Sequence, residues 1–257
     1  AKIGAKRDNH IDNENTVWLS TRGSGLAKYN NDGGTFTYYT PGKIEANFTP
    51  VYSENNHISD FQLYCLCEDK NNNLWIGTEL GGLSCLNKKT MKFTNYMHTD
   101  DNSSISSNLV RVVYCDSKGT IWVGTNIGLN KFDKKTASFK RYTTKEGLVG
   151  NTVQGIIEAS EGILFISTNS GISRFDTGKE IFTNYSTRNG LLSNEYSTGA
   201  CIKRKSGELV FGSVNKGLLS FFPEKLNDAL PKAEVLISQI KIRNKELEVG
   251  EFDILEK

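Results

Sequence analysis

Several residue types and patterns that mark particular protein classes are scarce or missing in this sequence. The 257 residues include only 4 Pro, 3 His and 2 Met, and none of the 5 Cys lies in a C-x-x-C pair. There is neither a signal peptide, with a basic start before an apolar stretch, nor a run of about 18 apolar residues. The sequence therefore predicts no membrane segment, and contact with a membrane is expected only through segments outside this chain.

A strong charge of either sign is also missing. Lys and Arg number 31 against 29 Asp and Glu, so the formal net charge is +2. Neutralising the phosphates of a nucleic acid requires a broad positive field, which this balance does not supply. We expect no nucleic-acid partner for this segment.

Helix-favouring residues are scarce, whereas turn and strand residues are abundant. The sequence has 9 Ala against 25 Asn and 24 Gly, and 10% of its residues are aromatic, which favours an all-β fold. Each cysteine lies singly among apolar residues and is interpreted as a small buried hydrophobe, so neither a metal site nor a cofactor is expected. These cysteines are Cys65, Cys67, Cys85, Cys115 and Cys201.

One short block recurs five times along the chain. Its best copy is Leu74-Trp75-Ile76-Gly77-Thr78, and the positions equivalent to Trp75 are spaced by 57, 47, 43 and 45 residues. This period is typical of the blades of a β-propeller. The equivalent positions are Trp18, Trp75, Trp122, Phe165 and Val210.

Further signals keep a fixed distance from each block. A glycine follows six or seven residues after the block position, and eleven residues after this glycine F-x-x-Y recurs in four copies, as in Phe93 to Tyr96. Another β-rich stretch precedes each block, as in Leu63–Glu68. The pattern predicts four strands in each unit, with the block in the second strand.

Alternation in the block indicates how the units pack. Successive strand side chains point to opposite faces, so Trp75 and Gly77 share one face and both faces of the unit are largely apolar. Stacking such sheets face to face around an axis buries both faces. We predict that Gly77, Gly124 and Gly212 make room for a large residue of a neighbouring blade.

The recurring signals, taken together, resemble the two-component regulator propeller repeat. They are W-[IV]-G-T, then G-[LI]-x-x-[FLY]-[ND], then F-x-x-Y, and finally a Gly-Leu step such as Gly147-Leu148. The resemblance covers about residues 15 to 223. It implies propeller repeats over 1–223 and, over 224–257, a linker and the first strands of a β-sandwich, beginning near Val235–Ile242.

The family implies a location and a function. Its propellers form the periplasmic sensor region of bacterial hybrid two-component systems, sense oligosaccharides or polysaccharide fragments, and signal to a histidine kinase outside this segment. The first residue, Ala1, and the strand-like C-terminal end are those expected of a piece of a longer protein. Family propellers have seven blades, so five units imply an incomplete ring, which predicts self-association, such as a homodimer, or a strained five-unit closure.

Nothing in the sequence predicts catalysis. His10, His57 and His98 lie in unrelated stretches, without a paired carboxylate, nucleophile elbow or metal spacing. A propeller enzyme, either a lyase of the streptogramin-inactivating kind or a glycoside-active one, remains the alternative, as does a scaffold that binds proteins on its rim.

Binding residues are expected where the repeat varies, because loops on one rim of a propeller carry recognition. The turns between second and third strands and the entries to the innermost strands are predicted to share a face. The turns contribute Arg22, Glu79, Asn126, Asn169 and Asn215, and the entries contribute Arg111, Gln154 and Tyr196.

Overall fold

The computed structural model describes residues 5–42, 57–226, 241–242 and 245–246. The chain divides into two compact units, Ala1–Pro223 and Glu224–Lys257. Within the described residues the only helices are the short 3₁₀ turns η1 (Thr187–Asn189) and η2 (Pro223–Lys225). The fold is all-β, as predicted.

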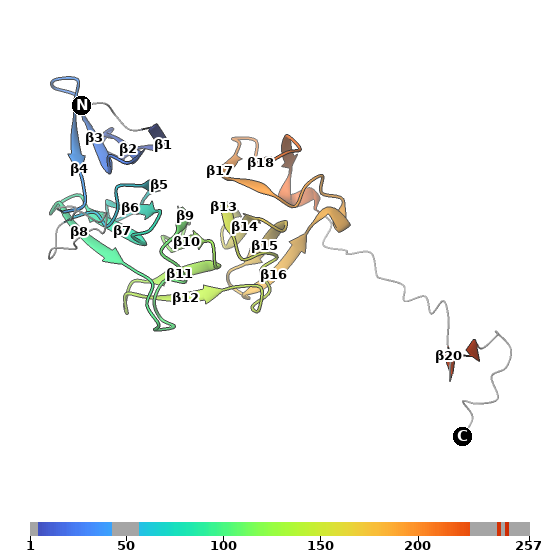
Figure 1. The fold of residues 1–257 in the computed structure, drawn as a ribbon. Coiled ribbons are helices and arrows are strands. Elements are labelled where there is room, and N and C mark those ends of the chain that lie inside the picture. Colours follow the sequence, from blue (N-terminus) through green and yellow to red (C-terminus); the bar gives the residue numbers. More distant parts are fainter. Residues whose placement is uncertain (1–4, 43–56, 227–240, 243–244, 247–257) are drawn as a thin grey trace. The chain divides into compact units, whose positions relative to one another are not determined.

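Four antiparallel sheets each consist of four strands that are consecutive in sequence. These sheets are the blades of a β-propeller (Figure 1). Blade 1 has β1 (Ala5–Ile11), β2 (Val17–Arg22), β3 (Leu26–Asn30) and β4 (Thr35–Tyr39); blade 2 has β5 (Leu63–Glu68), β6 (Asn73–Thr78), β7 (Leu83–Asn87) and β8 (Lys92–Tyr96); blade 3 has β9 (Val110–Cys115), β10 (Ile121–Thr125), β11 (Leu129–Asp133) and β12 (Ser138–Tyr142); blade 4 has β13 (Val153–Ser160), β14 (Ile163–Thr168), β15 (Ile172–Asp176) and β16 (Ile181–Tyr185).

The fifth sheet has three strands among the described residues. They are β17 (Tyr196–Lys203), β18 (Leu209–Ser213) and β19 (Leu218–Phe221). In the second unit β20 (Lys241–Ile242) pairs with β21 (Lys245–Glu246). The predicted sandwich strand Val235–Ile242 lies mostly outside the described residues, as does the extra stretch before blade 2.

The block-bearing strand is the second of each blade, as the spacing predicts. Trp122 in β10 pairs with Tyr114 of the inner strand and Lys131 of the third strand, and its side chain is 1% exposed. Its ring contacts Phe175 of the next blade edge to face, with centroids 5.7 Å apart. Tryptophan thus joins neighbouring blades as well as filling its own.

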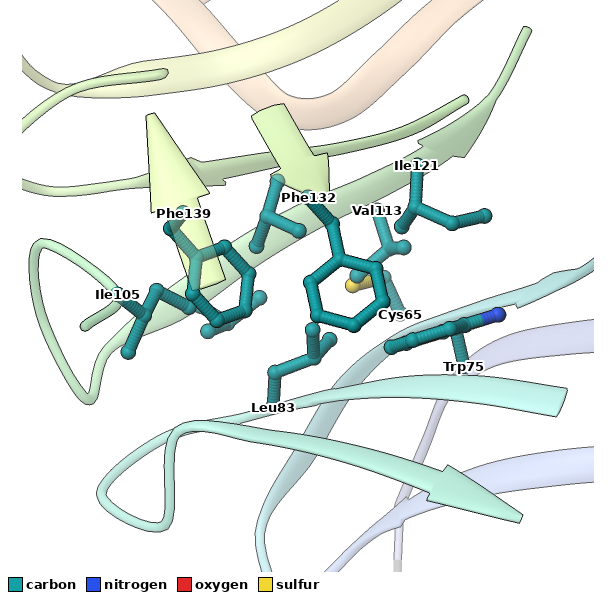
Figure 2. Close-up of a cluster of buried hydrophobic side chains, with 10 residues drawn as sticks. Cys65, Trp75, Leu83, Ile105, Val113, Ile121, Phe132 and Phe139 are labelled. Atoms are coloured by element: carbon teal, nitrogen blue, oxygen red, sulfur yellow. The ribbon is translucent and has the colours of Figure 1, made fainter. Parts of the chain in front are cut away.

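The same contact recurs between blades 2 and 3. Trp75 meets Phe132 at 5.0 Å between ring centroids, and Figure 2 shows the two rings with Leu83 and Phe139 in one buried cluster. Phe139 belongs to an F-x-x-Y copy on β12, the fourth strand of its blade. The repeated aromatic positions therefore form the interior between blades.

A buried carboxylate accompanies each tryptophan. Asp116 lies in the turn before β10, where Oδ1 accepts the Thr120 N–H and Oδ2 accepts the Trp122 indole N–H, both at 2.8 Å. Asp69 with Trp75 and Asp12 with Trp18 repeat this arrangement. Six residues before Phe165 and Val210, which have no indole, the chain has Ala159 and Arg204.

Two of the three block glycines make room for a neighbouring blade. A Cβ on Gly77 would lie 2.7 Å from Val110 Cγ1 of blade 3, and one on Gly124 would collide with Val153 of blade 4. The prediction is wrong for Gly212, because all the nearest atoms around a Cβ there belong to Ala200 and Leu218 of its own blade.

The inner strands bring the blades together. Contacts run in order through β1, β5, β9, β13 and β17, and β17 also contacts β9 (Figure 1). All five cysteines are free thiols, and burial raises the pKa of Cys67 to about 12, which keeps it protonated. In the described part of the chain, no helix has the length and apolar character to traverse a bilayer.

Candidate ligand-binding face

In blades 2, 4 and 5 a backbone hydrogen bond joins the turn between the second and third strands to the segment entering the inner strand of the same blade. The Glu79 N–H donates to the Gln62 carbonyl at 2.9 Å, and the Asn169 N–H donates to the Thr152 carbonyl at 3.2 Å. Val214 and Glu195 repeat this bond in blade 5. Turns and entries therefore share one face, which we call the entry face.

The same segments also link successive blades. The Gly23 N–H donates to the Phe61 carbonyl at 3.1 Å, which joins blades 1 and 2, and the Gly82 N–H donates to the Asn108 carbonyl at 3.0 Å, which joins blades 2 and 3. Between blades 3 and 4 the Thr152 hydroxyl donates to a turn carbonyl at 3.3 Å. The entry face is thus a continuous hydrogen-bonded surface across four blades.

Each of the turns in blades 1 to 4 runs from a threonine to a glycine three or four residues later, as in Thr125–Gly128 and Thr78–Gly82. Gly82 has φ +74°, a left-handed conformation that L side chains rarely adopt, and a Cβ there would collide with the Tyr96 carbonyl. The Thr78 hydroxyl donates to the Gly82 carbonyl at 2.8 Å and closes the loop. The residues between Thr and Gly are left to vary.

Four polar side chains in blades 2 and 3 on this face have a buried atom without a hydrogen-bond partner. Buried polar atoms are nearly always paired, so these four atoms are available to bind a polar partner. Three were predicted from sequence and one, Gln62, was not, although its place before an inner strand matches the entry criterion. The atoms are Gln62 Oε1, Glu79 Oε2, Arg111 Nε and Asn126 Oδ1.

A hydrogen-bonded chain crosses three inner strands. The Arg111 Nη1 of β9 donates to Thr198 Oγ1 of β17 at 3.3 Å, and this hydroxyl donates to Gln154 Oε1 of β13 at 2.5 Å. Sequence reasoning missed Thr198 because a register shift between Tyr196 and Cys201 displaces it from the position of Arg111 and Gln154.

The remaining predicted residues have other surroundings. Arg22 and Asn215 are exposed, and Asn169 Oδ1 accepts the Thr152 N–H at 3.3 Å. Tyr196 is 2% exposed and contacts Phe211, so it lies in the core rather than on the entry face.

A cleft of about 510 Å³ lies among the inner strands. Its walls are mainly apolar and include two tyrosines, Tyr64 and Tyr114. Its charged lining residues are Asp8, Arg111 and Lys203.

The histidines do not gather into one site. His10 Nε2 lies 3.4 Å from Glu68 Oε2, whereas His98 Nδ1 lies 2.8 Å from the Ile105 carbonyl. Among the described residues, no group of three or more His, Cys, Asp or Glu side chains could hold a metal ion. The entry face offers hydrogen-bonding groups, which suit recognition of a polar ligand.

Comparison with known families identifies the repeat. Residues 57–79 and 104–126, which contain the first two strands of blades 2 and 3, match the two component regulator propeller model. No curated protein matches the chain.

Solved structures share the fold. The extracellular domain of the hybrid two component system BT3049 from B. thetaiotaomicron is 22% identical over 86% of this chain and 29% of its own, with a TM-score of 0.72. The extracellular domain of BT4673 from the same organism is 20% identical over 88% of this chain and 30% of its own, with a TM-score of 0.71.

PorZ, a surface component of the type-IX secretion system of Porphyromonas gingivalis, is more distant. It is 15% identical over 84% of this chain and 32% of its own, with a TM-score of 0.61. The chain spans about three tenths of the length of each of these three structures.

Proposed function

We propose that this chain, which carries two component regulator propeller repeats, is a ligand-sensing part of a bacterial receptor and binds an oligosaccharide on its entry face. The observation that carries the proposal is the set of four unpaired buried polar atoms, on Gln62, Glu79, Arg111 and Asn126. Three are acceptors and one is a donor. Sugar hydroxyls donate and accept, so an oligosaccharide can pair all four.

The solved structures support the sensing role. BT3049 and BT4673 are extracellular domains of hybrid two component systems. By analogy, the chain lies in the periplasm, and the intact protein carries a histidine kinase outside this segment. The chain itself binds ligand without turnover.

Binding would reach the kinase through the arrangement of the receptor. A ligand shifts a conformational equilibrium only by its difference in affinity for the two states. Ligand on the entry face changes how the propeller packs against the following segment or a second copy of the chain, and a homodimer is the simplest such assembly.

The proposal is tested by a thermal-shift screen of the 257-residue chain against plant, host and microbial oligosaccharides. A ligand at 100 times its dissociation constant stabilises the folded state by about 2.7 kcal/mol. The hit is then titrated by calorimetry into the parent, Asn126→Ala and Glu79→Gln, with the exposed Asn102→Ala as the matched control.

Weaker binding by Asn126→Ala and Glu79→Gln, with the Asn102→Ala affinity unchanged, would support the entry face as the site. A parent-like affinity in both variants would remove the site from this face. Absence of any hit would contradict the oligosaccharide-sensing proposal, and saccharide cleavage by the chain would favour the enzyme alternative.

A further inference from the structure

We propose that the inner-strand cleft binds the carboxylate or sulfate group of an acidic oligosaccharide and that Arg111 holds this group. The inference rests on the proposed function and specifies the charge of the ligand. It follows from the unused hydrogen-bonding capacity of one guanidinium and from the charges that surround it.

Arg111 is a cation without a compensating anion. It lines the cleft, its Nη1 donates only to the neutral Thr198 hydroxyl, and its Nε is buried without an acceptor. Across the described residues, Arg111 forms no ion pair. A guanidinium presents five N–H groups in a planar fork that matches the geometry of an oxyanion.

Among the described residues that line the cleft, the only carboxylate is already engaged. Asp8 Oδ2 accepts the Leu66 N–H at 2.9 Å, and Asp8 Oδ1 accepts the Asn9 N–H at 2.8 Å. The other cation, Lys203, donates to the Ala159 carbonyl at 2.7 Å. The lining therefore carries two cations against one carboxylate, and the guanidinium is the group with free donors.

The surroundings of Arg111 suit a sugar rather than a free inorganic anion. Tyr64 and Tyr114 line the same cleft, and aromatic rings offer apolar faces to the C–H surface of a sugar ring. Gln154 and Thr198 are within reach for hydroxyl contacts, since they are linked to Arg111 through hydrogen bonds. Arg111 lies near the start of β9, where the inner strand begins, and it also lines the cleft.

A purely structural role for Arg111 predicts different behaviour. The link to Thr198 uses one N–H of the guanidinium at 3.3 Å, so its loss would lower stability without changing which saccharides bind. A binding role predicts loss of discrimination between acidic and neutral saccharides.

The test compares matched saccharides on the 257-residue chain by calorimetry. One arm contains short oligogalacturonides, alginate oligosaccharides and other uronates; a second contains sulfated chondroitin and heparan oligosaccharides; a third contains the methyl-esterified oligogalacturonides and neutral oligosaccharides. The proteins are the parent, Arg111→Gln, Arg111→Lys and the control Arg188→Gln, whose residue is exposed on η1. Melting temperature without ligand reports whether each variant is folded.

We expect a binder in the uronate or sulfate arm whose affinity falls at least about tenfold in Arg111→Gln, falls less in Arg111→Lys, and is unchanged in Arg188→Gln. Binding in the uronate arm identifies a carboxylate, whereas binding in the sulfated arm alone identifies the sulfate, because those saccharides also carry uronates. Preference for the neutral arm, or unchanged affinity in a folded Arg111→Gln, would overturn this inference and leave the sensor function standing. Absence of binding in all three arms would overturn both.

Discussion

The carboxylate that accompanies each tryptophan gives a sharp prediction of stability. Asp116 is 4% exposed and accepts two hydrogen bonds, from the Trp122 indole N–H and the Thr120 N–H, each at 2.8 Å. In Asp116→Ala both donors lose their acceptor, and Trp122 is 1% exposed, so water does not readily replace it. An unsatisfied buried donor costs about 1–3 kcal/mol, which predicts a loss of about 3 kcal/mol for the pair.

The variant Trp122→Phe tests the hydrogen bond from the indole N–H to Asp116 while leaving the bond from the Thr120 N–H in place. It keeps an aromatic ring against Phe175 but removes the N–H that Asp116 accepts together with part of the buried indole ring, so some packing is lost as well. We expect a loss of about 2 kcal/mol, and the double variant with Asp116→Ala should lose less than the two single variants combined, because they share one bond.

The assay is urea unfolding followed by fluorescence and circular dichroism. The urea concentrations at the midpoints of unfolding are compared only between variants whose unfolding free energy has the same dependence on urea concentration. A change in that dependence would mean that the unfolding reaction itself has changed. Asp100→Ala, at an exposed position in a loop, is the control and should match the parent. If Asp116→Ala unfolds at the same urea concentration as Asp100→Ala, the carboxylate does not hold the blade turn and the reasoning fails.

Two further predictions concern pH and packing between blades. Burial opposes ionisation of Asp12, but hydrogen bonds from Lys88, Trp18 and backbone N–H groups outweigh it and lower its pKa to about 2. The lowered pKa contributes about 2 kcal/mol of stability, which is present above about pH 4 and is lost as the pH falls toward about 2. The free energies of unfolding of the parent and of Asp12→Asn should therefore converge over that interval. A constant difference between the two free energies would contradict this prediction. Gly124→Ala should lose about 1–3 kcal/mol by collision with Val153, whereas Gly190→Ala, with open space around it, should show only the strain of its φ of +93°; equal losses would contradict packing between blades.

The sequence predicted those features that repetition makes visible. Strand order and the buried position of Trp122 follow from spacing and alternation, which local side-chain geometry enforces in every copy. The Asp six residues before each Trp was visible in the same alignment. It was missed because an acidic residue in a turn is normally solvated.

The candidate site was less predictable because its features depend on contacts between blades. Thr198 reaches Arg111 only through a shift in the register of β17, which spacing alone does not reveal. Tyr196 lies in the core because it is the equivalent of Val110 and Val153: it pairs with the last residue of the second strand, as they do, and all three are buried. Whether a side-chain atom such as Asn126 Oδ1 has a hydrogen-bond partner is set by its neighbours in space, which only the folded structure reveals.

The links along the entry face have a consequence for how the proposed sensor can diversify. The turns are joined to their own blade through main-chain groups, as in the bonds from Glu79 to Gln62 and from Asn169 to Thr152. A main-chain bond of this kind forms whichever side chain the turn carries. Residues 79 and 214 can therefore change without loss of these bonds, so new ligand specificities can evolve on an unaltered frame.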